Sequence, residues 1–268
     1  MKIREFMEKV YADTGSDLSF LPQTCDTLKT GNPDAELRKI AVTMFGTVDV
    51  IRQAGAWGAN LLIVHEPFYY DHWDSREFWD GQTGLKKQVM EEKRRLAAEC
   101  GMTVYRYHDH PHFRAEDFIA LGEVKYFGLK GQWTQGARAH SHFTLDTPLP
   151  VREIAKTLEK NLNIARVRLC GDADIACQKI ALCFGTPGRI EEELEDNDLV
   201  LTGEICEWAV GEYVRDCAQL GHKKAVIVMG HCCSERDGMR FTAEWIQEKY
   251  PEFPARYFEC GDVYSYAD

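Results

Sequence analysis

Two stretches of the chain repeat each other: GNPDAELRKIAVTMFGT at residues 31–47 and GDADIACQKIALCFGT at residues 171–186. Both contain an initial glycine, an aspartate, the run Lys-Ile-Ala and the pair Gly-Thr, at a spacing of 140 residues that falls to 139 after one deletion. Self-similarity of this kind indicates an internal duplication, so the two copies are expected to form the same supersecondary unit.

The repeat continues beyond the quoted stretches. Val50-Ile51 corresponds to Arg189-Ile190, and the apolar run at 61–64 corresponds to the run at 199–202. Each copy is therefore expected to form a strand, a helix and a second strand. Such a unit favours parallel strands with a right-handed crossover. We therefore expect an α/β fold of two pseudo-twofold-related lobes with mixed, largely parallel sheets, lobe 1 at 1–125 and lobe 2 at 126–268, with a metal site in the cleft between them.

The remaining segments fit this architecture. Hydrophobic periodicity predicts further helices and strands, and the Gly- and Trp-rich stretch Gly128–Gly136 is expected to be a turn-rich connection between the lobes. The additional helices are expected at 91–100, 151–160 and 242–250, and the additional strands at 102–107 and 225–229.

Composition narrows the class of protein. The 268 residues carry a formal net charge of −11, which disfavours non-specific nucleic-acid binding, and no apolar run approaches the ~18 residues of a membrane helix. The ten cysteines include no Cys-x-x-Cys pair, and the N-terminus resembles no secretory signal, so we expect reduced, mostly buried thiols in a cytoplasmic protein. A phosphate-bearing substrate would then need a locally positive site, such as a metal ion.

Histidines and acids gather directly after three of the expected strands. Because open α/β sheets bind ligands at the carboxyl ends of their strands, imidazole and carboxylate groups there predict a site for a divalent ion. Pro111 argues against a helix that pairs His108 with His112, so these two are expected to converge through a loop. The residues concerned are His65 and Glu66 after the first strand, His108, His110 and His112 after the second, and His231 with Glu235 after the third.

Other polar residues have weaker support. At the offset of 139, Glu204 ends the second unit where His65 ends the first. His140 and His142 alternate on an expected strand and are interpreted as a solvated or core-rim pair, and Cys232 as a structural thiol. Phosphate-loop, dinucleotide-binding, hydrolase-elbow and zincin motifs are absent from the sequence.

Five motifs in this order resemble those of the NIF-three-like family, the dinuclear metal centre hexameric proteins, which are often described as type 2 GTP cyclohydrolase I homologues. The resemblance spans nearly the whole chain and suggests the short form of the family. The motifs are TGNPDAELRKIAV (30–42), IVHEP (63–67), YHDHPH (107–112), LTGE (201–204) and MGHCCSE (229–235).

The resemblance implies one or two divalent ions per chain, of zinc, iron or manganese, and a homohexamer. This chain departs from the family where His-Glu-Pro replaces His-His-Pro, and where His112 replaces an aspartate that can bridge two ions. A bridge between two ions would then come from Glu66, Glu235 or water. Asp109 could also replace the missing aspartate. In the second repeat, Glu204 stands where the family has the aspartate of Thr-Gly-Asp. Trp208 takes the place of a common histidine and is expected to pack in the interior or line the pocket. The implied metal ligands are His65, Glu66, His108, His112, His231 and Glu235.

The expected function is that of a metal-dependent hydrolase. A metal-bound water would act on a small molecule, a nucleotide in a GTP cyclohydrolase-like reaction, with Glu66 and Glu235 as catalytic residues. Phosphate ester or amide hydrolysis is equally available to such a centre. The alternatives are a non-enzymatic metal-binding oligomer that works as a metal chaperone, regulator or scaffold, and a metal-free α/β binding protein.

Overall fold

The computed structural model describes residues 1–136 and 139–267, and the chain divides into two compact units that are each built from two segments. Unit 1 consists of Met1–Phe118 and Met239–Gly261, and unit 2 of Ile119–Gly238 and Asp262–Asp268. The sequence placed one boundary between residues 125 and 126. The structure instead returns the chain to unit 1 after Gly238, because the late strand β11 (Ala255–Tyr257) pairs with β2 (Ile40–Thr43).

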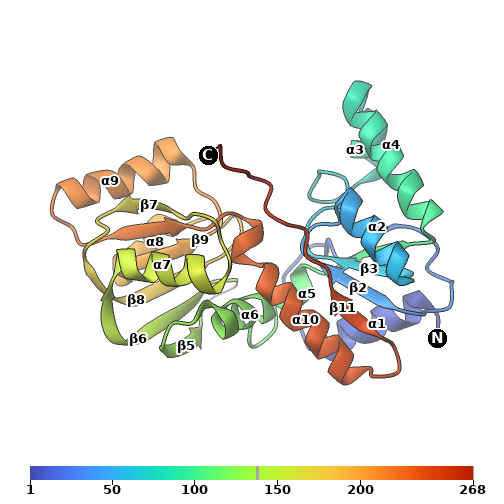
Figure 1. Cartoon of the computed structure of the whole chain (residues 1–268), viewed down its shortest axis with the longest axis horizontal. Coiled ribbons are helices and arrows are strands. Elements are labelled where there is room, and N and C mark those ends of the chain that lie inside the picture. The colour runs from blue at the N-terminus through green and yellow to red at the C-terminus, as the bar shows by residue number, and fades with distance from the viewer. Residues whose placement is uncertain (137–138, 268) are drawn as a thin grey trace. The chain divides into compact units, whose positions relative to one another are not determined.

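Unit 1 contains a five-stranded sheet in the order β1-β4-β3-β2-β11 (Figure 1). Strands β11, β2, β3 and β4 are parallel neighbours, and only the edge strand β1 runs antiparallel, against β4. Besides β2 and β11, its elements are α1 (Ile3–Thr14), β1 (Leu28–Thr30), α2 (Val48–Trp57), β3 (Leu61–Val64), α3 (Arg76–Gly81), α4 (Gly84–Glu99), β4 (Thr103–Arg106), α5 (Asp109–His112) and most of α10 (Arg236–Lys249).

Unit 2 contains a six-stranded sheet in the order β5-β6-β8-β9-β10-β7. Strands β8, β9 and β10 are parallel, whereas β5, β6 and β7 pair antiparallel with their neighbours. The elements are α6 (Phe118–Phe127), β5 (Gly131–Gln135), β6 (Ser141–Pro150), α7 (Val151–Asn161), β7 (Arg168–Gly171), β8 (Ala176–Cys183), α8 (Ile190–Asp196), β9 (Leu199–Thr202), the π-helix η1 (Glu207–Gly211), α9 (Glu212–Gln219), β10 (Ala225–Val228) and the 3₁₀-helix η2 (Cys232–Ser234).

The duplicated strand–helix–strand unit is confirmed in both halves, and with it the α/β fold class. In unit 1 it is β2–α2–β3, and in unit 2 it is β8–α8–β9, with parallel strands in each. The likeness extends to a third parallel strand, β4 or β10, and to a short antiparallel strand beside it, β1 or β7. The duplication therefore covers four neighbouring strands of each sheet, whereas β11 in unit 1 and β6 in unit 2 differ, since β11 is parallel to β2 and β6 is antiparallel to β8.

Strands buried on both faces explain the continuous apolar runs in the sequence. In β8, Ile180 and Leu182 pack with α7 in one core cluster, while Ala181 and Cys183 pack with α8 and α9 in another. In unit 1, Leu62 and Val64 pack against α2 and α4, which lie beside each other in Figure 1. Helices therefore cover both faces of the unit 2 sheet, and polar chemistry is confined to the strand ends.

Several local expectations are corrected. The stretch Gly128–Gly136 is not only a connection, because residues 131–135 form β5, which pairs antiparallel with β6. Half-buried and exposed residues alternate along β5. Two helices begin earlier than expected, α4 at Gly84 and α10 at Arg236, so Glu235 directly precedes α10. Among the described residues, no helix combines the length and the apolar character needed to cross a bilayer.

A contact between glycines joins α6 to the start of α10 within unit 2. A Cβ atom added at Gly122 would lie 2.4 Å from Gly238 Cα and 2.5 Å from the Asp237 carbonyl oxygen. The two helix backbones can approach this closely only because neither glycine has a side chain, and the contact places the segment that follows Glu235.

We expect Gly122→Ala to destabilise unit 2 by about 1–3 kcal/mol, because the overpacking against backbone atoms outweighs the roughly 1 kcal/mol gain in helix propensity. Urea unfolding followed by circular dichroism measures this change. Gly188→Ala in the same unit is the control, since a Cβ there meets nothing within 4 Å. Equal stability of the two variants would contradict the packing argument.

Candidate metal centre

The first cluster of polar side chains begins directly after β3. His65 is fully buried, and its backbone N–H donates to the carbonyls of Thr43 and Met44 at 3.2 and 3.1 Å. Its Nδ1 lies 3.1 Å from the carbonyl oxygen of Tyr107. A carbonyl only accepts, so Nδ1 carries the proton and the lone pair of the neutral ring is on Nε2.

The second part of the cluster follows β4, where the backbone is held by Asp26. The Asp26 carboxylate accepts hydrogen bonds from the backbone N–H groups of His108 at 2.6 Å and His110 at 2.8 Å, and it lies 2.6 Å from His110 Nδ1. The segment then forms the single turn α5, contrary to the loop that Pro111 predicted. Pro111 is tolerated because it is in the first turn, where its missing N–H would have no partner within the helix.

Asp109 orients the His108 ring. Its Oδ1 lies 3.0 Å from His108 Nδ1, and its Oδ2 accepts from the Thr24 hydroxyl at 2.7 Å and from the Cys25 N–H at 2.9 Å. Burial alone would raise the pKa of Asp109, but the hydrogen bonds from His108, Thr24 and Cys25 outweigh it and hold the pKa below its usual value. The ionised carboxylate favours a proton on Nδ1 of His108 and leaves Nε2 for other ligands.

His112 is held in the same way by Asp117. The two side chains are buried, and His112 Nδ1 lies 2.9 Å from Asp117 Oδ2. A carboxylate on Nδ1 fixes both the tautomer and the orientation of the ring, as is usual for histidines that bind metals.

The three rings converge. Potential ligand atoms of His65, His108 and His112 all lie within 4.8 Å of one another, and the ring centroids are 4.7–5.1 Å apart. Burial, followed by the nearby imidazoles of His108 and His112, lowers the pKa of His65 well below its usual value. The cluster therefore presents nitrogen donors, that of His65 in a neutral ring, at a spacing that a metal ion with bonds of ~2.1 Å can draw together.

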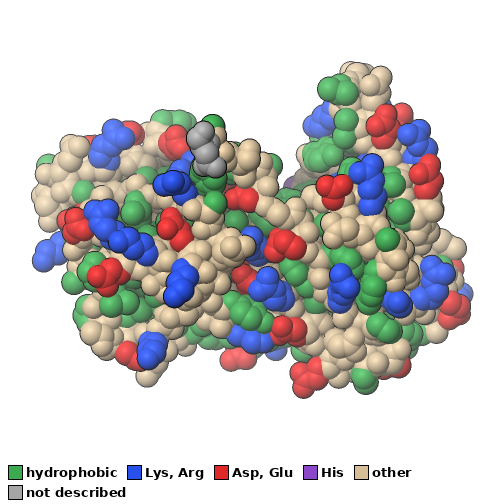
Figure 2. Space-filling view, in the orientation of Figure 1, with side chains coloured by type: hydrophobic (Ala, Val, Ile, Leu, Met, Phe, Trp, Pro, Cys, Tyr) green, Lys and Arg blue, Asp and Glu red, His purple; other side chains and the backbone are tan. Residues whose placement is uncertain are grey.

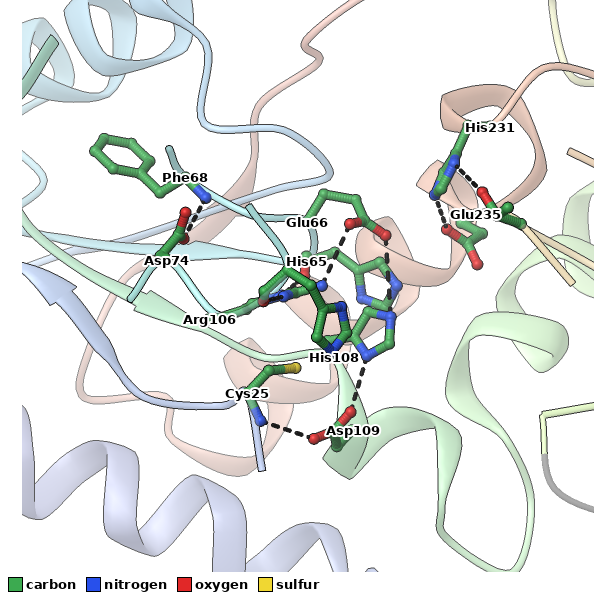
Figure 3. A network of polar contacts seen from close by, with 12 residues as sticks. Cys25, His65, Glu66, Phe68, Asp74, Arg106, His108, Asp109, His231 and Glu235 are labelled. Carbon is green, nitrogen blue, oxygen red and sulfur yellow. Dashed lines mark hydrogen bonds and ion pairs between the residues drawn. The ribbon is translucent and has the colours of Figure 1, made fainter. Parts of the chain in front are cut away.

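A carboxylate completes this donor set. Glu66 Oε1 lies 4.0 Å from His108 Nε2, and Glu66 Oε2 lies 3.3 Å from the Arg106 guanidinium (Figure 3). A second group, Cys25, His108 and Asp109, also offers donor atoms within 4.8 Å of one another. However, burial and the neighbouring Asp26 raise the pKa of Cys25, which disfavours the thiolate that a metal would require.

Unit 2 carries a His/Glu pair of its own after β10. His231 Nδ1 lies 2.8 Å from Glu204 Oε1 and 3.0 Å from the Thr186 hydroxyl, and His231 Nε2 lies 3.3 Å from Glu235 Oε2. A Cβ at Gly185 would meet Glu235 Oε1 at 2.5 Å, so glycine is required where this loop passes the carboxylate. With Nδ1 donating to Glu204, an imidazole lone pair and a carboxylate face each other, an arrangement that calls for a proton or a cation.

The structure thus brings His65, Glu66, His108 and His112 together in unit 1, and His231 and Glu235 together in unit 2. The sequence expectation that all six bind the same metal centre stays a prediction. The strand registers align Leu61 with Leu199, each paired with the isoleucine of the preceding strand, so Glu204 corresponds to Glu66 and not to His65.

Two further expectations can be compared with the structure. The Trp208 side chain is 83% exposed on η1, so the expected interior packing is wrong. His140 and His142 do form a partly exposed pair, and both contact the Glu193 carboxylate, at 2.9 and 3.1 Å.

Sequence reasoning missed the residues that orient the ligands. Asp26, Arg106 and Asp117 are all buried and charged, yet none belongs to a recognisable motif. The sequence indicates these residues only indirectly, because charged residues flank many apolar strands and also the histidine segment. A metal-binding histidine normally requires a partner for its second nitrogen, which is the rule that would have prompted a search for them.

Comparison with known proteins agrees with the motif resemblance. The family described as Duf34/NIF3 (NGG1p interacting factor 3) matches residues 26–260. The GTP cyclohydrolase 1 type 2 homolog of Pyrococcus abyssi is 25% identical over 224 residues, 80% of this chain and 82% of the relative. NGG1-interacting factor 3 of Saccharomyces cerevisiae is 23% identical over 261 residues, 87% and 84% of the respective chains.

The fold agrees as well. The solved structure of protein ybgI, described as of unknown function, has a TM-score of 0.75 to this chain at 19% identity, and the match covers 98% of this chain and 100% of the other. At this identity the likeness supports the fold, while the family match covers most of the sequence. The chain belongs to the Duf34/NIF3 family.

Proposed function

We propose that this chain is a metal-dependent hydrolase and that unit 1 binds a divalent ion through His65, His108, His112 and Glu66. The observation that carries the proposal is that each of the three imidazoles has Nδ1 fixed by a carbonyl or a carboxylate. With Nδ1 engaged in this way, Nε2 is the nitrogen through which each ring can bind a cation.

The donor types favour a borderline metal. Imidazole nitrogens suit zinc and iron, and a carboxylate oxygen also suits manganese, in line with the family resemblance. Such an ion lowers the pKa of a water ligand toward ~7 and so supplies a nucleophile at neutral pH. We propose one or two ions per chain, with His231 and Glu235 of unit 2 as further ligands.

The carboxylates have a second role in this proposal. Glu66 faces the imidazole cluster through Oε1, and Glu235 lies 3.3 Å from an imidazole nitrogen that can exchange a proton with it. Both are largely buried, which places them where solvent competes little for the proton. We assign Glu66 and Glu235 as the residues that move protons during hydrolysis.

The substrate that we propose is a nucleotide. Relatives from Pyrococcus abyssi and Yersinia pestis are named GTP cyclohydrolase 1 type 2 homologs. The chain has a net charge of −11, and Figure 2 shows acidic and basic side chains intermixed on the face in view. A bound divalent ion would supply the local positive charge that a phosphate group requires.

A second candidate function is non-catalytic. The yeast relative is named after an interaction with another protein, which favours a metal-binding oligomer that works as a chaperone, regulator or scaffold. Hydrolysis of GTP by the metal-loaded protein that is lost in Glu66→Gln would support the enzyme. Metal binding without turnover of any nucleotide would favour the alternative.

The first prediction from this proposal concerns metal content. We expect dialysed protein to retain at least one zinc, iron or manganese ion per chain by elemental analysis, and His112→Ala to lose that ion because one of its nitrogen donors is gone. His222→Ala is the control, since this exposed histidine lies outside the cluster. Metal-free wild-type protein that is folded would overturn the proposal.

A separate measurement tests the unit 2 ligands. We expect His231→Ala and Glu235→Gln to lower the number of ions retained per chain or their resistance to chelator, because each removes a donor while leaving the cores intact. Their metal content is compared with that of Thr186→Val, which removes a hydroxyl contact to His231 but no donor of the proposed set. Unchanged retention in both ligand variants would confine the metal site to unit 1.

A further inference from the structure

Arg106 is a fully buried cation at the edge of the histidine cluster. It is the last residue of β4, and in the parallel register it pairs with Val64, the residue before His65. Its Nε donates to the His65 carbonyl at 2.8 Å, its Nη1 to the His72 carbonyl, and its Nη2 to Glu66 Oε2 at 3.3 Å (Figure 3). The guanidinium therefore contacts three residues of the segment 65–72, which contains the proposed ligands His65 and Glu66.

The burial of this charge is costly and must be compensated. A guanidinium in the interior is tolerated when its donors are hydrogen bonded and a counter-ion is near. Glu66 is that counter-ion, with its side chain 10% exposed and that of Arg106 0% exposed. Arg106 and Glu66 thus form an ion pair of two largely buried side chains, in which removal of either partner weakens the compensation of the other charge.

The pair makes the two oxygens of Glu66 unequal. Oε2 contacts the guanidinium, and Oε1 is directed to the imidazole side, 4.0 Å from His108 Nε2. Because the planar guanidinium has a fixed arrangement of donors, it sets the rotation of the carboxylate more firmly than an ammonium group could. The carboxylate is then oriented before any ion binds.

We propose that Arg106 is a positioning residue of this metal site, which holds Glu66 so that one oxygen is presented to the ion and the other is retained by the guanidinium. This inference rests on the proposed metal binding in unit 1. It assigns Arg106 no contact with the ion or the substrate, and its effect is exerted through Glu66.

The experiment measures Co²⁺ binding to the whole chain by the visible absorption of the ion. We expect Arg106→Lys to weaken Co²⁺ binding 10- to 100-fold, the usual loss when an outer-shell partner is removed, and to alter the absorption band because the carboxylate is no longer fixed. Lys93→Met is the matched control in unit 1. Lys93 is also buried and donates to the Phe68 carbonyl at 2.7 Å, so its loss should reduce stability but leave Co²⁺ affinity unchanged.

A double-mutant cycle tests the route of the effect. If Arg106 acts through Glu66, Arg106→Lys combined with Glu66→Gln should bind Co²⁺ no more weakly than Glu66→Gln alone. Losses that multiply would show that Arg106 acts independently of Glu66 and would overturn the proposal, as would wild-type affinity in folded Arg106→Lys.

The failure of Arg106→Lys to fold, the absence of the metal site and the absence of a role for Arg106 give different results. If Arg106→Lys does not fold by circular dichroism, Arg106→Gln with Glu66→Gln removes both charges together, and its affinity is compared with that of Glu66→Gln; a further loss would again count against the proposal. Wild-type protein that binds no Co²⁺ would instead refute the metal site itself. A Co²⁺-binding wild type with an unaffected Arg106 variant would refute only the role of Arg106.

Discussion

The hydrogen bonds that fix Nδ1 of three converging imidazoles are the constraint on which the candidate site depends. His65, His108 and His112 each commit Nδ1 to an acceptor, so none can turn its protonated edge toward the others without losing a hydrogen bond. Proton uptake is also opposed, because burial and the neighbouring rings lower the pKa of His65. The proposed cation, bound through the Nε2 atoms, would leave these hydrogen bonds in place.

This arrangement depends on where the chain places carboxylates. Asp26 holds the backbone of His108 and His110, Asp109 holds one ring, and Asp117 holds another. Each of the three contributes to the position of the histidines without having to bind a metal itself. Their shared effect is to hold the histidine segment in place through hydrogen bonds, and their negative charge would partly compensate the proposed divalent ion.

The sequence predicted the features that follow from periodicity and spacing. Apolar runs such as Leu61–Val64 and Leu199–Thr202 must be buried on both faces, and the polar residues soon after them, His65 and Glu204, must lie at strand ends. The sequence did not predict contacts that depend on short or distant segments. Asp26 reaches His108 because the edge strand β1, only Leu28–Thr30, pairs with β4, and nothing in three half-exposed residues marks that pairing.

The same reasoning explains the two local errors at the site. Pro111 is a reliable helix breaker in an interior turn, but a helix of a single turn has no interior, so the rule did not apply to α5. Glu204 was matched to His65 by counting residues from the repeat. The alignment of the apolar runs Leu61–Val64 and Leu199–Thr202, which the hydrogen-bond register supports, instead matches Glu204 to Glu66.

The exchange of ligand types between two motifs has a physical consequence of its own. Relative to the family pattern, this chain has a carboxylate after β3 and an imidazole at the end of α5. A carboxylate after β3 is next to the end of β4, where Arg106 is within reach because Val64 and Arg106 are paired in the parallel register. An imidazole at position 112 needs an acceptor instead, and Asp117 supplies it five residues later. Each exchanged ligand is therefore accompanied by a buried residue of the charge that it requires.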